Sequence, residues 1–144
     1  IVLLAMFLPV LAGQSGNTGA QALAVLIREM TQGDLGPRVK AQLIKESILG
    51  VVHGFMVGCI CAVVMYVIAS SQGNPHVITL SIIILFSMTA SCLVSGLMGA
   101  FVPVVLKKFG ADPAAGSSII LTTGTDVVSM GVMLFLANKF ILGN

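Results

Sequence analysis

One carboxylate lies in the middle of a long apolar stretch near the end of the chain. From Pro113 to Asn138 the sequence has 26 residues and a single charged side chain, Asp126. A helix of that length is about 39 Å long, enough to cross a hydrocarbon core of about 30 Å with some tilt. A carboxylate at such a depth costs from ~2.5 to more than ~10 kcal/mol, so it normally has a function. Asp126 is therefore the first candidate functional residue.

Hydroxyl side chains precede this carboxylate on the same helical face. Ser118, Thr122 and Asp126 follow one another at four-residue intervals, which places them on one stripe of an α-helix. Oxygen ligands without a nearby His or Cys suit a hard cation, and Mg²⁺ is usually held by one or two carboxylates while it keeps several waters. Asp112, just before Pro113, has two interpretations, as the N-cap of the helix or as a second, inner cation site.

A second polar stretch at membrane depth lies near the start of the chain, in residues 8–22. The residues that share one helical face there are Pro9, Gly13, Gly16 and Asn17. Polar, glycine-rich helix at this depth is tolerated where it is buried in protein or lines a wet cavity. We therefore expect this helix and the one that carries Asp126 to face a polar pathway. Two chains around a two-fold axis would supply two carboxylates.

The composition indicates an integral membrane protein. Of the residues 57% are hydrophobic and 8% are charged, against about 25% charged in soluble domains. No basic patch with interleaved aromatic residues is present, so nucleic-acid binding is not indicated. We predict an all-α fold whose transmembrane helices are 3–28, 47–70, 76–106 and 113–138.

The boundaries of these helices carry further expectations. The third contains Pro103, so we expect a kink or an interfacial end near 101–108. Residues 33–37 predict a break, and 37–46 a short polar helical lead-in to the second helix. His53 is expected to be an interfacial histidine bonded within its helix. Small residues at four-residue spacing predict close helix packing; they are Gly50, Gly54 and Gly58, and Cys92, Gly96 and Ala100.

Basic residues predict the orientation in the membrane. The connections 28–46 and 107–112 fall on one side and hold six of the seven Lys and Arg residues. By the positive-inside rule this side is cytoplasmic and the C-terminus lies outside. The membrane is expected to be the cell (inner) membrane. The chain lacks an initiator Met, and its first twelve residues lack the basic region of a signal peptide. We expect it to begin inside or just before a transmembrane helix, with upstream parts of the natural protein missing.

Two motifs resemble those of the MgtE family of magnesium channels. Pro9, followed by Gly16-Asn17-Thr18-Gly19 and Gln21-Ala22, resembles the family's second-helix signature. Asp112-Pro113-Ala114, with Asp126 fourteen residues after Asp112, resembles its fifth-helix signature. The resemblance covers essentially all of residues 1–144. These residues resemble helices two to five of a domain with about five transmembrane helices, which implies a pore domain truncated at its N-terminus. Ser15 departs from the second glycine that bacterial members commonly have before the Asn-Thr-Gly.

The resemblance implies a homodimer with a pore between its subunits, lined by the first and last helices of this chain. An intramembrane aspartyl protease would need two aspartates within the membrane, and only Asp126 lies deep, so we expect no enzyme activity. The implied cargo is a largely hydrated Mg²⁺, bound at Asp126. With the polar residues above, the expected metal site is Asp126, Asn17, Gly13, Gly16, Thr122, Ser118 and Asp112. Three alternatives remain open: Na⁺-coupled Mg²⁺ exchange or export, transport of Co²⁺, Mn²⁺ or Ca²⁺, and a non-transporting assembly subunit.

Overall fold

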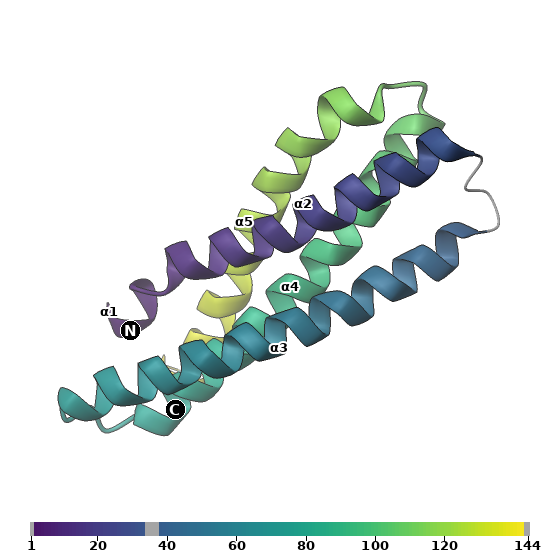
Figure 1. The fold of residues 1–144 in the computed structure, drawn as a ribbon. Helices are drawn as coiled ribbons and strands as arrows, with labels where there is room; N and C mark the ends of the chain where they lie inside the picture. Colours follow the sequence, from purple (N-terminus) through teal and green to yellow (C-terminus); the bar gives the residue numbers. More distant parts are fainter. Residues whose placement is uncertain (1, 34–37, 143–144) are drawn as a thin grey trace.

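Long helices make up almost all of the structure, a computed structural model that describes residues 2–33 and 38–142. The elements are α1 (Val2–Ala5), α2 (Leu8–Gln32), α3 (Val39–Ser71), α4 (Val77–Lys108), α5 (Pro113–Ala137) and the π-helical turn η2 (Asn138–Leu142). Each long helix runs antiparallel to the one before it (Figure 1). The described residues contain no β-strand, and the expected all-α fold is confirmed.

Helix α4 is the centre of the arrangement, because α2, α3 and α5 all pack along it while α2 and α3 scarcely touch each other (Figure 1). The predicted close packing through the glycines of α3 is confirmed, and the structure shows that their partner is α4. A Cβ atom added to Gly50 would lie 2.6 Å from the carbonyl oxygen of Cys92, and one added to Gly54 would lie 2.8 Å from that of Met88. From the other side, a Cβ on Gly96 would lie 2.8 Å from the carbonyl oxygen of Glu46.

Helix α2 crosses α4 with an equally close approach. A Cβ on Gly99 of α4 would collide with the carbonyl oxygen of Gly19 on α2. On α5, the Leu121 side chain fills the space beside Gly19, where an added Cβ would lie 3.1 Å from its Cδ1. These contacts hold α2 between α4 and α5, which fixes the position of its polar residues.

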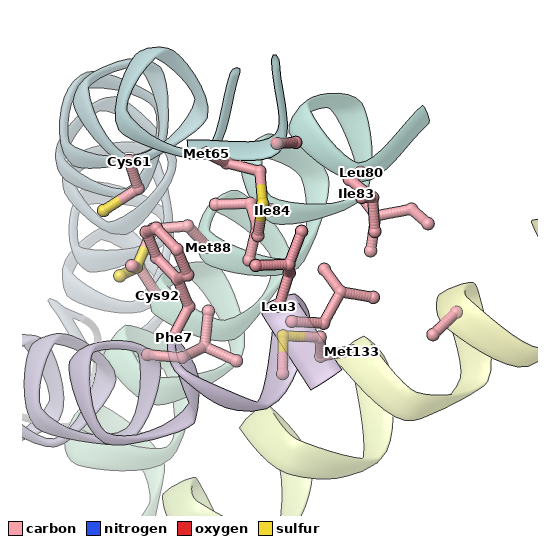
Figure 2. Close-up of a cluster of buried hydrophobic side chains, with 14 residues drawn as sticks. Leu3, Phe7, Cys61, Met65, Leu80, Ile83, Ile84, Met88, Cys92 and Met133 are labelled. Carbon is pink, nitrogen blue, oxygen red and sulfur yellow. The ribbon is translucent and has the colours of Figure 1, made fainter. Parts of the chain in front are cut away.

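A buried apolar cluster closes the end of the bundle where α1 and η2 lie. Figure 2 shows Phe7 from the turn before α2, Met65 from α3, Met88 from α4 and Met133 from α5 pointing toward one another. Flexible methionines suit this meeting point of several helices, because they fill irregular gaps. The opposite end contains the end of α2 and the α4–α5 connection, so the two basic connections lie on one side as expected (Figure 1).

The helix bounds differ from the expected ones in three places. The first expected helix, 3–28, is divided at Met6 and Phe7, because Pro9 has no N–H with which to continue the hydrogen bonding. The expected polar lead-in and the second expected helix form one continuous helix, α3, which begins at Val39. Residues 34–37 of the predicted break lie outside the described residues. Helix α4 continues through Pro103 to Lys108.

Among the described residues, three helical segments are long and apolar enough to cross a membrane: Val39–Ser71, Val77–Lys108 and Ser117–Ile141. Helix α2, with 25 residues, is long enough to span but is not among these three. The polar groups of its first half lower its hydropathy, so α2 needs protein or water around it.

Candidate cation pathway on helices α2 and α5

Asp112 starts helix α5 as its N-cap. Its backbone is extended, and its Oδ1 accepts a hydrogen bond from the backbone N–H of Ala114 at 2.9 Å. Pro113 occupies the first helical position, where its missing N–H costs nothing. The structural interpretation of Asp112 is therefore confirmed. Its second role, as an inner cation site, stays a prediction for an exposed carboxylate at this end of the helix.

Helix α5 has polar side chains on two adjacent faces, one exposed and one buried. On the outer side, Ser118 and Thr122 are exposed and Asp126 is half-buried. Thr122 donates its hydroxyl proton to the carbonyl of Ser118 at 2.9 Å, which leaves the oxygen lone pairs of Thr122 free to accept. On the inner side, Thr125 and Ser129 are fully buried. The predicted stripe thus faces out of the chain.

The predicted site residues of α2 also lie on an outward face of the chain. Gly13 and Asn17 are exposed and Gly16 is half-buried. A Cβ added to Gly13 or Gly16 would meet nothing within 4 Å, so packing within this chain does not require either glycine. What these glycines provide is a surface without side chains, on which backbone carbonyls can be approached from outside.

A buried hydrogen bond joins α2 to α5 directly behind these faces. The hydroxyl oxygens of Ser15 and Ser129 are 2.7 Å apart, and both side chains are fully buried. Asn17 lies two residues after Ser15, and Asp126 lies three residues before Ser129 on the antiparallel helix. Both positions are therefore displaced by about 3–4.5 Å in the same direction along the bundle. Asn17 and Asp126 lie at nearly the same depth.

The predicted site residues form a path along the bundle and not a single cluster. Ser118 lies eight residues before Asp126, and Asp112 fourteen, which corresponds to about 12 and 21 Å along a helix. Within the part of the chain that the structure describes, no three His, Cys, Asp or Glu side chains group together as they would around a bound metal. One chain therefore offers one carboxylate at the depth of Asn17.

Sequence reasoning missed the buried polar contacts behind this path. We expected His53 to be bonded within its own helix. In the structure its Nδ1 lies 3.1 Å from the hydroxyl of Thr18 on α2, so it contacts another helix. Ser87 and Ser91 on α4 are buried, and their hydroxyls have no hydrogen-bond partner among the described residues. Serines at four-residue spacing were the signal for this stripe, but the spacing does not say which helix they face.

Comparison with known proteins places this arrangement in one family. The family model MgtE, described as a divalent cation transporter, matches residues 8–136. A magnesium transporter MgtE of Bacillus subtilis is 29% identical over 142 residues, which are 98% of this chain and 30% of that protein. One of Enterococcus faecalis is 31% identical over 96% of this chain and 29% of its own length.

A magnesium transporter MgtE of Thermus thermophilus is 28% identical over 95% of this chain and 29% of its own length. The chain thus spans less than a third of the length of these curated relatives. The family match covers α2 to α5 almost completely, and so includes both helices that carry the polar path. The chain belongs to the MgtE family of divalent cation transporters.

Proposed function

We propose that two copies of this chain form a Mg²⁺ pore between them, lined by α2 and α5, with Asp126 as its central cation site. The observation that carries the proposal is the exposure of polar groups at membrane depth. Asn17 and Thr122 are exposed and Asp126 is only half-buried on the single chain. Such groups are not left against lipid, because lipid offers them no hydrogen bonds. A second copy around a two-fold axis covers this face and keeps it wet.

The geometry supports transport of an ion that keeps its water. Two Asp126 carboxylates, one from each copy, match the charge of Mg²⁺. Asn17 lies at the same depth and can accept hydrogen bonds from the water shell, as can the carbonyls beside Gly13 and Gly16. The carbonyl oxygen of Thr122 already accepts a hydrogen bond from the Thr125 hydroxyl at 3.0 Å. The hydroxyl oxygen of Thr122 is therefore a better acceptor for water than the carbonyl oxygen of the same residue. Mg²⁺ strips its water reluctantly, which favours this mode of binding.

The direction of passive flow follows from the membrane potential. Two charges that move through about 100 mV gain ~4.6 kcal/mol, so a channel of this kind admits Mg²⁺ to the cytoplasm. Exposed basic residues at the end with the α4–α5 connection support a cytoplasmic location of that end and an external C-terminus; they are Arg38, Lys40, Lys45, Lys107 and Lys108.

Uptake of Mg²⁺ into proteoliposomes tests the proposal, with the unchanged protein beside Asp126→Asn. This variant keeps the size of the side chain and removes its charge. We expect uptake to fall tenfold or more, equivalent to about 1.4 kcal/mol or more of lost stabilisation. Glu29→Gln makes the same chemical change on a half-buried carboxylate outside the path and should leave uptake unchanged.

Equal uptake by Asp126→Asn and the unchanged protein would contradict the proposal and leave Asp126 as a packing residue. Competition by Co²⁺, Mn²⁺ and Ca²⁺ then defines the ion. If the Mg²⁺ flux depends on a Na⁺ gradient, the mechanism is coupled exchange and not a passive channel.

A further inference from the structure

A polar cavity lies between α2 and α3, beside the proposed pore helix. Its volume is about 280 Å³, and its polar lining comes from Thr18, Gln21, Lys45, Glu46 and His53. The space exists because α2 and α3 each pack on α4 and barely on each other. None of the residues proposed for the pore lines it. At roughly 30 Å³ per water molecule, the cavity has room for several waters.

Glu46 is a buried carboxylate on the wall of this cavity. Its side chain is only 6% exposed. Gln42 donates a hydrogen bond from its Nε2 to Oε1 of Glu46 at 3.0 Å, and within the described part of the chain no other donor reaches this carboxylate. The charged residues that act on it are Lys45 on the same helix and Glu29 on α2, which are of opposite sign. A carboxylate buried with so little compensation either takes up a proton or has a cation as its partner.

His53 provides a second acceptor on the same wall. The Thr18 hydroxyl donates to the carbonyl of Gln14 at 2.9 Å, and it also lies 3.1 Å from Nδ1 of His53. A hydroxyl has one proton to donate, so while Thr18 donates to Gln14 it is the Nδ1–H tautomer of His53 that donates to Thr18. The lone pair of Nε2 then remains free.

We propose that this cavity is a second cation site, which binds a hydrated divalent cation through the Glu46 carboxylate. His53 lies seven residues after Glu46 on α3, about 10.5 Å along the helix. It is therefore too far away to share the ion directly and binds a water of its shell, as does the Gln21 amide. One carboxylate with several retained waters is a usual arrangement for Mg²⁺. Lys45 is exposed, and its flexible chain can carry the ammonium away from the ion.

An ion in this cavity would connect two helices that have few contacts with each other, among them the one between Thr18 and His53. Thr18 directly follows Asn17 of the pore face. The bound ion would therefore help to hold the pore helix in position from behind, at a place separate from the ion path.

The chain contains only two histidines, His53 at the cavity and His76 in the turn before α4, which makes a direct test possible. The probe is Mn²⁺, a paramagnetic divalent cation that broadens NMR signals near its binding site. The protein carries Asp126→Asn, to remove the proposed pore site, and is labelled with ¹⁵N in its histidine rings. We expect Mn²⁺ to remove most of the His53 ring signal, while His76 keeps its intensity, and excess Mg²⁺ to restore the His53 signal.

Two further variants in the same background decide the role of Glu46. Glu46→Gln should abolish the broadening of His53, whereas Glu29→Gln, a nearby carboxylate that does not line the cavity, should leave it intact. Broadening of His53 that persists in Glu46→Gln would overturn the proposal. Absence of any broadening reversed by Mg²⁺ while Glu46 is present would also overturn it, and this result holds even if the Glu46→Gln protein does not fold. None of these readouts depends on flux, so they are independent of the pore proposal.

Discussion

Neighbouring residues of α5 lie on adjacent faces of the helix that differ in burial. Asp126 lies on the outer side, where a cation can reach it, and Thr125 and Ser129 face inward. The Ser129 hydroxyl meets Ser15 of α2, so the contact that sets the depth of Asp126 against Asn17 lies directly behind the proposed ion site. The outer residues can therefore be changed without loss of packing, and the inner ones cannot.

The contact between Ser15 and Ser129 predicts a stability effect with a matched control. Ser129→Ala removes a buried hydrogen bond, so we expect the protein to lose about 0.6–1.5 kcal/mol of stability. Ser118→Ala removes an exposed hydroxyl from the same helix, and we expect it to leave stability unchanged within about 0.5 kcal/mol. Unfolding in detergent, followed by circular dichroism, measures both. Equal stability of the two variants would show that the contact does not hold α2 against α5.

The two roles of Asp112 are separable by two substitutions. Asp112→Ser keeps an oxygen that can cap the helix and removes the charge, whereas Asp112→Ala removes both. We expect Asp112→Ala to cost about 1 kcal/mol of stability and Asp112→Ser much less. If the carboxylate is an inner cation site, both variants need more Mg²⁺ to reach half-maximal uptake. An uptake curve that stays unchanged in both variants would leave Asp112 as a helix cap alone.

Sequence reasoning found the residues of the proposed path because residue type and helical spacing are local properties. Asp126, Thr122 and Ser118 stand out within one apolar run, and so do Gly13 and Asn17 in theirs. The contacts between Ser15 and Ser129, and between Thr18 and His53, could not be found in this way. They join residues 114 and 35 positions apart, and their register is set by the packing of α2, α3 and α5 along α4. The cavity at Glu46 escaped for the same reason.

At the scale of helices, glycine has two different uses in this chain. In α3, Gly50 and Gly54 are needed because the backbone of α4 lies where a side chain would be. In α2, Gly13 has nothing of its own chain within 4 Å of an added Cβ. The sequence predicted close packing through the glycines of α3 correctly, because glycines at four-residue spacing form one smooth stripe, but it did not identify α4 as the partner. It could not distinguish the packing glycines from those that leave a surface open.

This difference gives a prediction with an internal control. Gly54→Ala places a methyl group 2.8 Å from the carbonyl oxygen of Met88, so we expect α3 and α4 to separate, at a cost of about 1–3 kcal/mol. Gly13→Ala meets no atom of its own chain, and we expect it to fold as stably as the unchanged protein. It should nevertheless lower Mg²⁺ uptake, because its methyl group would point into the proposed pore. Thermal unfolding and uptake, measured on the same samples, separate the two effects.

At the scale of the whole molecule, the outer surface of the chain is of two kinds. Most of α3 exposes large apolar side chains such as Phe55 and Ile60, which are 52% and 66% exposed, as a surface toward lipid would be. The exposed face of α2 and α5 instead presents Asn17, Ser118 and Thr122. This second face is unsuited to lipid, so we expect a second copy to bind there.

Cross-linking between copies tests this assignment of the two faces. In a chain whose native Cys59, Cys61 and Cys92 are replaced by alanine, we place one cysteine at Thr122→Cys and, separately, at Ile60→Cys. Two Thr122→Cys side chains would face each other across a pore that holds a hydrated ion. A short bifunctional thiol reagent should therefore join them into a covalent dimer in membranes. Ile60→Cys, equally accessible but directed at lipid, should stay monomeric.

Saturating Mg²⁺ should slow the reaction at Thr122→Cys, because the ion and its water would occupy the space between the two thiols. Gel electrophoresis under denaturing conditions reads out the covalent dimer directly. A dimer formed through Ile60→Cys and not through Thr122→Cys would place the interface on α3. The polar face of α2 and α5 would then need some other cover, and two Asp126 carboxylates would no longer share one ion.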